Sequence, residues 1–365
     1  MGPPSRQWTI ARRTRKPGAA GGAFARFLLR RVLLAVLVVF GVVVITFFLC
    51  RVIPADPAGL WVGIHATPEN LAQARAKLHL DDSLPVQFWY YMTGLIHGDL
   101  GTSIRTHNPV LKDIEVKLPA TFELVTASLI IAIGVGIPLG ILAGVRRGKW
   151  PDHLARFFAV GGVALPSFWV AVLLQMILVQ ILGILPLQGR FSDSLAIVYP
   201  MKRITGFLVI DALLQGNFVR FEDAVAHLIL PAITLALYPL GLVTRMVRTM
   251  MIEVLGENYI RTAKAYGMPS RVIHYRYALK NAIAPAIVVV SLSFAYELTG
   301  AFLIENIFVW NGIGQYAFLS ALSFDYPAIL GCTIVVAVFY VVMNLSVDLI
   351  QSFLDPRIVL AKGGG

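Results

Sequence analysis

The chain has 365 residues, of which 57% are hydrophobic and only 14% are charged, and its formal net charge is +11. A soluble protein of this length could not bury so much apolar surface in one or two cores, so the composition excludes an ordinary soluble domain. Long uncharged tracts separate the charged residues, which is typical of a protein that crosses a membrane several times.

A basic segment opens the chain. Its first 31 residues carry eight of the 31 Lys and Arg residues, and the first acidic residue is Asp56. Such a segment before an apolar span stays in the cytoplasm and is attracted to anionic headgroups. No aromatic or base-reading module accompanies it, so we expect membrane lipid and no nucleic acid as its partner. Residues 1–26 are predicted to be a disordered tail.

Six apolar stretches are long enough to cross a bilayer as helices. They cover residues 32–50, 121–145, 157–182, 228–251, 283–304 and 328–353. We therefore predict an all-α membrane protein with six transmembrane helices. The first helix is assigned to residues 27–50, and the other five form a core at residues 119–353.

The distribution of charge predicts the orientation. With the N-terminus inside, the cytoplasmic segments hold 21 Lys and Arg residues against four acids, and the segments outside hold 10 against 13. The positive-inside rule favours this arrangement, with both termini in the cytoplasm and residues 354–365 as a second cytoplasmic tail. Residues 51–118 then form an extracytoplasmic segment, and residues 184–226 form a second lid element outside.

An aromatic cluster at residues 88–91 lies within the long outer segment. Such a cluster suits the membrane–water interface or packing over the mouth of the helix bundle. A small folded cap with its own apolar core explains the cluster equally well. Both interpretations stay open at this stage.

Small and ionisable residues mark individual spans. Gly136, Gly140 and Gly144 recur every four residues, so they share one helix face and predict close packing within the subunit. A charge at mid-bilayer costs about 2.5–3.5 kcal/mol, so Glu297 and Asp348 are expected to face protein or water. We expect a helix contact for Asp348. For Glu297, a pathway or gating role and a hydrogen-bonded helix contact both stay open.

No catalytic signature is present in the sequence. It contains no HExxH and no GxSxG, the two cysteines give no metal spacing, and Gly148-Lys149 is followed by Trp150 rather than by the end of a Walker A loop. We therefore expect no enzyme activity, no metal and no cofactor in this chain. If transport is driven by ATP, the hydrolysis must take place on another polypeptide.

A loop at residues 252–281 carries the functional prediction. Its first part combines helix formers with small residues, and Gly267 is a plausible stop for a helix. A second short helix is expected from Ser270, as its N-cap, toward Asn281. Two such helices would form a compact knob that fits a groove on a cytoplasmic partner.

This loop resembles the coupling ("EAA") loop of ABC-importer permeases in its peptide/nickel form. The predicted ATPase-coupling site consists of Glu257, Tyr259, Arg261, Thr262, Ala263, Ala265 and Gly267. Further stretches that resemble the family are 98–103 (GDLGTS), 118–124 (LPATFEL), 227–232, 305–314 (ENIFVWNGIG), 325–327 and 355–357. The departures are Asn311, where the family usually has proline, and an N-terminal extension of about 25 residues.

The resemblance implies a type I ABC importer permease fold in the inner membrane, and a B-type subunit of dipeptide or oligopeptide importers. It implies a related C-type permease as heterodimer partner, two ATP-binding subunits that carry ATP and Mg, and an extracytoplasmic solute-binding protein. Transport would proceed by alternating access. The alternative, a carrier driven by an ion gradient, requires several intramembrane acids or bases, and Glu297 is the only deep candidate. No substrate-binding residue is assigned.

Overall fold

The structure, a computed structural model, describes residues 18–52, 57–63 and 66–354. These residues are almost entirely helical, with one isolated β-bridge between Thr102 and Pro109. The prediction of an all-α protein is therefore confirmed. The tail predicted at 354–365 and the motif at 355–357 lie almost wholly outside the described residues. The same holds for most of the tail at 1–26, although the first helix already begins at Gly18.

Five helices in the described residues are long and apolar enough to cross a membrane. They are α1 (Gly18–Val52), α5 (Val110–Val145), α10 (Phe218–Leu255), α13 (Leu279–Ile307) and α15 (Tyr326–Leu354). Each contains one of the predicted spans. Helices α5 and α10 begin about ten residues before the apolar stretch, because polar residues that favour helix extend them beyond the hydrophobic segment.

The third predicted span is broken. Helix α6 (Trp150–Ala164) is followed by α7 (Ser167–Leu174) and a π-helical turn η1 (Gln175–Ile181), and the two halves meet at 108°. Leu165 is extended and Pro166 lacks an amide proton, so the first helix ends there. The stretch predicted at 157–182 is therefore apolar enough for a sixth span, but as two helices with a sharp bend between them.

Helices α5 and α10 pack closely through glycine. A Cβ atom on Gly140 would lie 2.7 Å from the Cβ of Val247, and one on Gly144 would lie 2.6 Å from the Cβ of Met251. The absence of side chains therefore lets the two backbones approach. The predicted role of this glycine face in packing within the subunit is confirmed.

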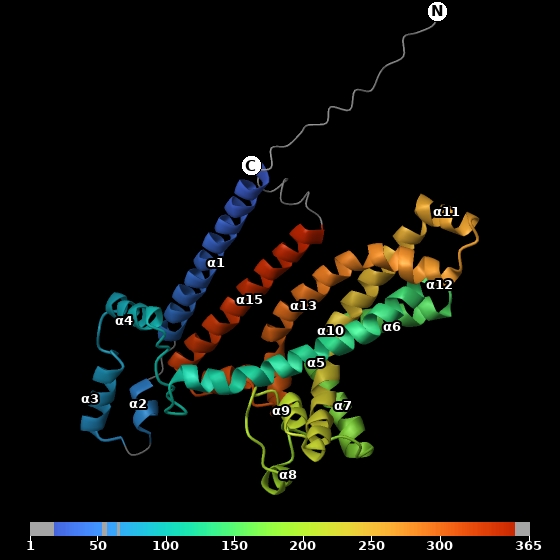
Figure 1. Ribbon diagram of the computed structural model, residues 1–365. Coiled ribbons are helices and arrows are strands. Elements are labelled where there is room, and N and C mark those ends of the chain that lie inside the picture. The colour runs from blue at the N-terminus through green and yellow to red at the C-terminus, as the bar shows by residue number, and fades with distance from the viewer. Residues whose placement is uncertain (1–17, 53–56, 64–65, 355–365) are drawn as a thin grey trace, which may run out of the picture.

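Helix α1 lies beside α15 (Figure 1). Arg31 of α1 forms an ion pair with Asp348 of α15 at 2.8 Å, which confirms the expected helix contact for Asp348. The outer segment folds as α2 (Pro57–Val62), α3 (Pro68–Lys77) and α4 (Leu84–Ile96). Phe88 and Tyr91 of α4 pack against Phe47 of α1, so these two members of the aromatic cluster cover the bundle.

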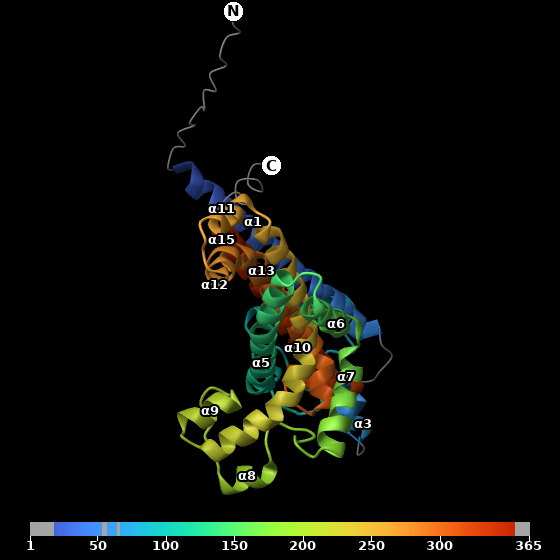
Figure 2. The same ribbon diagram turned by 90° about the vertical axis from the view of Figure 1, so that its right-hand side faces the viewer.

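The bundle has two distinct ends (Figures 1 and 2). At one end lies α11 (Asn258–Ala265), at the same end of the bundle as the start of α1; we call this the α11 end. At the other end lie α8 (Asp193–Val198) and α9 (Leu208–Leu214), within the 182–217 segment that joins η1 to α10. We call this the α9 end. Helix α14 (Ile313–Leu322) follows α13.

Candidate functional site

The predicted coupling loop contains one separate short helix. Helix α11 ends at Ala265, and Gly267 has a φ of +70°, with the Met268 N–H bonded to the carbonyl of Ala263 at 3.2 Å. A left-handed glycine after the last turn is a common helix stop, so this part of the prediction is confirmed.

The second half of the loop differs from the prediction. The residue that precedes α12 (Ser270–Val272) is Pro269, and Ser270 is the first helical residue. The prediction that Ser270 is the N-cap is therefore wrong. The chain continues without interruption through a π-helical turn η2 (Ile273–Ala278) into α13, so the second stretch is the first part of a membrane helix.

Helix α11 is anchored to the bundle by two side chains. Ile260 is fully buried and Ala263 is buried, and both pack in a cluster with Met251 of α10, Ile273 of η2 and Ala282 of α13. In addition, the Asn281 side-chain amide donates to the Tyr259 hydroxyl at 2.8 Å. The short helix is therefore held between two membrane helices.

The opposite face of α11 is open. Of the predicted coupling residues, Ala263 points into the cluster, and the others are exposed: Glu257, Tyr259, Arg261, Thr262, Ala265 and Gly267. Ala265 and Gly267 add little or no side chain to this exposed face. Sequence reasoning missed the anchor Ile260, although the apolar pair at positions 260 and 263 was its signal.

At the α9 end, two of the stretches that resemble the family meet in one buried network. The Thr121 hydroxyl donates to Glu305 Oε1 at 2.5 Å and accepts the Ile313 N–H at 2.9 Å. The indole N–H of Trp310 donates to the Ala120 carbonyl at 2.8 Å. The stretches 118–124 and 305–314 are thus joined by hydrogen bonds that the sequence alone did not indicate.

Two further stretches pair in the same way. The Ser103 hydroxyl donates to Asp325 Oδ2 at 2.5 Å, and the Arg105 N–H donates to the same oxygen at 3.1 Å. Asp325 is fully buried, so these bonds satisfy a carboxylate that burial would otherwise penalise. The connection fixes the loop before α5 to the start of α15.

Asn311 departs from the family pattern for a local reason. Its φ is +53°, a conformation that the ring of proline forbids and that asparagine adopts more readily than most residues. Its side-chain oxygen accepts a hydrogen bond from Lys117 at 2.6 Å. The asparagine therefore supplies a polar contact to α5 at this turn.

Glu297 lies buried in α13, where the Ser128 hydroxyl of α5 donates to its Oε2 at 2.5 Å. Its other oxygen has no hydrogen-bond partner among the described residues. The residue also lines a cavity of about 390 Å³ with Tyr238, Tyr296 and the break between α6 and α7. The structure thus provides a helix contact for one oxygen, and the pathway role stays a prediction.

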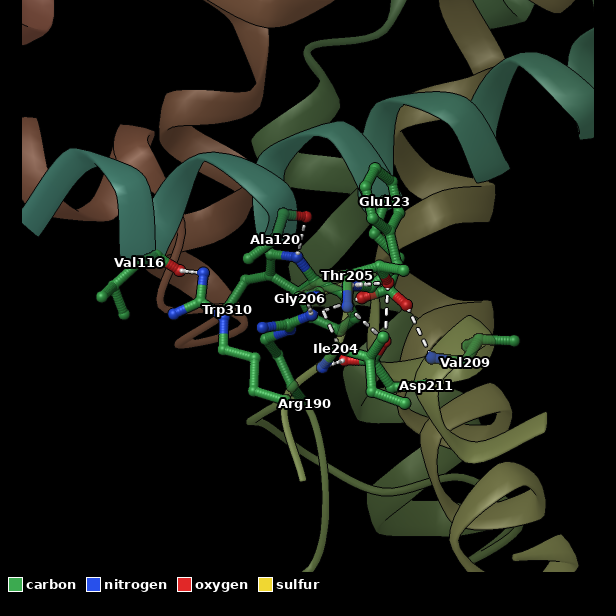
Figure 3. Close-up of polar contacts among 12 residues, drawn as sticks. Val116, Ala120, Glu123, Arg190, Ile204, Thr205, Gly206, Val209, Asp211 and Trp310 are labelled. Carbon is green, nitrogen blue, oxygen red and sulfur yellow. Dashed lines mark hydrogen bonds and ion pairs between the residues drawn. The ribbon is translucent and has the colours of Figure 1, made fainter. Parts of the chain in front are cut away.

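A second polar network ties the 182–217 segment to α5 (Figure 3). Arg190 donates to Glu123 at 2.5 Å and to the Gly206 carbonyl at 3.1 Å, and its guanidinium lies over the Trp310 ring at 5.6 Å. The other oxygen of Glu123 accepts the Val209 N–H at 2.8 Å. Glu123 therefore holds both the segment and α9.

Asp211 organises the turn before α9. It accepts hydrogen bonds from the hydroxyl and N–H of Thr205 and from the N–H groups of Ile204 and Gly206, at 2.6–3.2 Å. Burial disfavours the charged carboxylate, but these hydrogen bonds outweigh burial and lower the pKa of Asp211 below its ordinary value. The turn is therefore held by an ionised carboxylate.

Membrane-length helices in one bundle, together with a short exposed helix held between two of them, are the arrangement expected of a transport permease. The family described as binding-protein-dependent transport system inner membrane component matches residues 136–360. The N-terminal part of such membrane components matches residues 24–125. The chain belongs to this family, and it is a multi-pass protein of the inner membrane.

Curated relatives cover nearly the whole chain. The probable D,D-dipeptide transport system permease protein DdpB of Escherichia coli K12 is 46% identical over 330 residues, which cover 90% of this chain and 96% of the relative. The dipeptide transport system permease protein DppB of the same strain is 39% identical, with 91% and 98% covered. The glutathione transport system permease protein GsiC of Salmonella typhimurium is 31% identical, also with 91% and 98% covered.

Proposed function

We propose that this chain is one of two permease subunits of an ATP-driven importer of dipeptides or oligopeptides. A related C-type permease would be its partner in a heterodimer. Two ATP-binding subunits would carry ATP and Mg, and an extracytoplasmic binding protein would deliver the substrate. The relatives named for dipeptide and glutathione transport support small peptides as the substrate class.

The α11 end is proposed to face the cytoplasm. The loop between α5 and α6 and the loop around α11 carry exposed basic side chains: Arg146, Arg147, Lys149, Arg261, Lys264, Arg271, Arg276 and Lys280. The positive-inside rule places such loops on the cytoplasmic side. The 182–217 segment and α2–α4 would then face the binding protein.

The anchoring of α11 between α10 and α13 is the observation that carries this proposal. Ile260 and Ala263 are buried among residues of both membrane helices, while the outer face of α11 is free for a partner. A force on α11 would therefore move α10 and α13 together, as expected for a rigid-body switch between inward- and outward-facing states. The chain needs no chemistry of its own for this function.

Reconstitution tests the proposal. The chain, its partner permease, both ATP-binding subunits and the binding protein are placed in liposomes, and uptake of a labelled dipeptide is followed. We expect uptake that requires ATP and does not change when a protonophore collapses the ion gradient. Uptake by this chain alone, without ATP and under an ion gradient, would overturn the proposal in favour of a gradient-driven carrier.

A further inference from the structure

A cavity of about 370 Å³ opens at the α9 end of the molecule. It lies between the start of α5, the 182–217 segment, α9 and α10, next to the network of Figure 3. Its lining is unusually basic: it contains Arg190, Lys202, Arg203 and Arg220. Apolar side chains, among them Phe191 and Leu208, complete the lining.

Two of these guanidinium groups are incompletely bonded: that of Arg220 is buried, and that of Arg190 is half-buried and paired with Glu123. Arg220 is only 4% exposed, and its Nη1 lies 3.5 Å from the Ser192 carbonyl and 3.6 Å from Asp223, both at the limit of a hydrogen bond. Its Nε has no partner among the described residues, and the same is true of the Nε of Arg190. Buried donors of this kind are costly unless a ligand completes them.

The acids near the cavity are already engaged. Asp211 accepts hydrogen bonds from three backbone N–H groups and a hydroxyl, and Glu123 accepts from Arg190 and from the Val209 N–H. Asp223 accepts both the hydroxyl and the N–H of Ser192. These three carboxylates face the four cations of the lining, so the cavity keeps a net positive charge.

Two more cations lie at its rim. Arg203 is exposed and donates to the backbone carbonyls of Glu115 and Val116, which carry no charge. Lys202 is exposed, and its ammonium group has no partner in the described part of the chain. The site thus presents guanidinium groups inside and exposed cations at its rim.

We propose that this cavity binds the terminal carboxylate of a peptide on its way into the permease. Guanidinium groups with open N–H donors match the planar geometry of a carboxylate, and the apolar lining suits a neighbouring side chain. The recessed volume fits a ligand of dipeptide size rather than the face of a protein. The proposal rests on the proposed function, because that function supplies the peptide.

Binding without transport provides the test. The chain with its partner permease is placed in nanodiscs, with no binding protein and no ATP. The ligands Ala-Ala and its C-terminal amide are titrated and followed by saturation-transfer NMR. We expect Ala-Ala to bind about tenfold more tightly than the amide, because the amide lacks the charge that the arginines recognise.

Substitutions of the two cations at the rim test whether the peptide binds in this cavity. Lys202→Gln and Arg203→Gln change exposed side chains, so the fold should be retained. Each is expected to weaken Ala-Ala binding about three- to tenfold and to leave amide binding unchanged. Lys112→Gln, an exposed lysine at the same end but outside the cavity, is the matched control and should have no effect.

Equal affinity for Ala-Ala and its amide would overturn the proposal, and so would variants that bind Ala-Ala like the native chain. If no peptide binds but Lys202→Gln weakens docking of the binding protein, the carboxylate belongs to that protein and the peptide assignment fails. A permease that binds Ala-Ala as expected but does not import would instead contradict only the proposed function.

Discussion

A single hydroxyl, that of Thr121, connects two distant parts of the chain. It donates to the fully buried carboxylate of Glu305 and accepts the N–H of Ile313 at the start of α14. Glu305 also accepts the Gln315 N–H at 2.9 Å. Buried polar groups that lose one partner incur the full cost of their desolvation, so the position tolerates no apolar replacement without loss.

Thr121→Val should lower the free energy of unfolding by about 1–3 kcal/mol, because it keeps the shape but leaves a carboxylate oxygen and an N–H without a partner. Thermal unfolding of the purified chain in detergent measures the effect. Thr249→Val is the control, since the exposed Thr249 bonds only to the carbonyl of Arg245 in its own helix. Equal melting of Thr121→Val and the native chain would show that the network contributes nothing.

The lowered pKa of Asp211 predicts that the free energy of unfolding depends on pH. Its pKa in the folded chain lies below the unfolded value of about 3.9, so the folded state binds fewer protons there. The stabilisation is therefore present above about pH 4 and is lost as the pH falls through the folded pKa. Asp211→Asn should melt at a lower temperature than the native chain at pH 6, and the difference should shrink below pH 4.

Asp193→Asn is the control for this experiment, because Asp193 lies exposed in the same segment. Its difference from the native chain should be small at every pH. A gap between Asp211→Asn and the native chain that persists unchanged to pH 3 would contradict a role for the ionised carboxylate.

At the scale of elements, the contact between α5 and α10 determines the bundle. A Cβ on Gly140 would lie 2.7 Å from the Cβ of Val247 and 2.9 Å from the carbonyl oxygen of Thr244. The backbone at Thr244 and the β-branched side chain of Val247 can shift only at a large cost in free energy. An atom added at Gly140 therefore pushes the two helices apart. This packing also supports the anchor of α11, whose cluster includes Val247.

Gly140→Ala should therefore destabilise the chain by about 1–3 kcal/mol, although alanine is the better helix former. Gly134→Ala lies on the same helix with nothing within 4 Å of the added Cβ, and it should leave stability unchanged or slightly higher. The thermal midpoints of the two variants in detergent make the comparison. If both variants melt alike, helix propensity rather than close packing governs this face.

Hydropathy predicted where the membrane helices lie, but it did not predict the sharp bend between α6 and α7 in the third span. A proline in a span kinks some helices and ends others, and the outcome depends on neighbours. Here α6 is held against α10 by glycine: a Cβ on Gly162 would lie 2.5 Å from the Leu237 carbonyl oxygen, and one on Gly241 would lie 2.6 Å from that of Ala159. The chain leaves this contact at Pro166. Such packing between helices is not visible in one sequence.

For the whole molecule, the sequence indicated the class of fold, the location of five membrane helices and the loop that contains α11. It also singled out the stretches 98–103, 118–124, 305–314 and 325–327. It did not reveal that these stretches pair through Ser103–Asp325 and Thr121–Glu305, because such bonds depend on three-dimensional proximity. The buried anchor Ile260 and the basic cavity at the α9 end were missed for the same reason.

The central claim is that the exposed face of α11 couples an ATPase to movement of the bundle. Its most direct test is the number of peptides imported per ATP hydrolysed, measured in proteoliposomes with the complete importer. Arg261→Gln alters the exposed face of α11, and Arg147→Gln alters another exposed arginine, in the loop between α5 and α6.

We expect Arg261→Gln to lower this ratio about tenfold while the complex still assembles, because loss of a charged contact at an interface commonly costs about one to a few kcal/mol. Arg147→Gln should keep the native ratio. An unchanged ratio in Arg261→Gln, or an equal loss in both variants, would contradict coupling through α11.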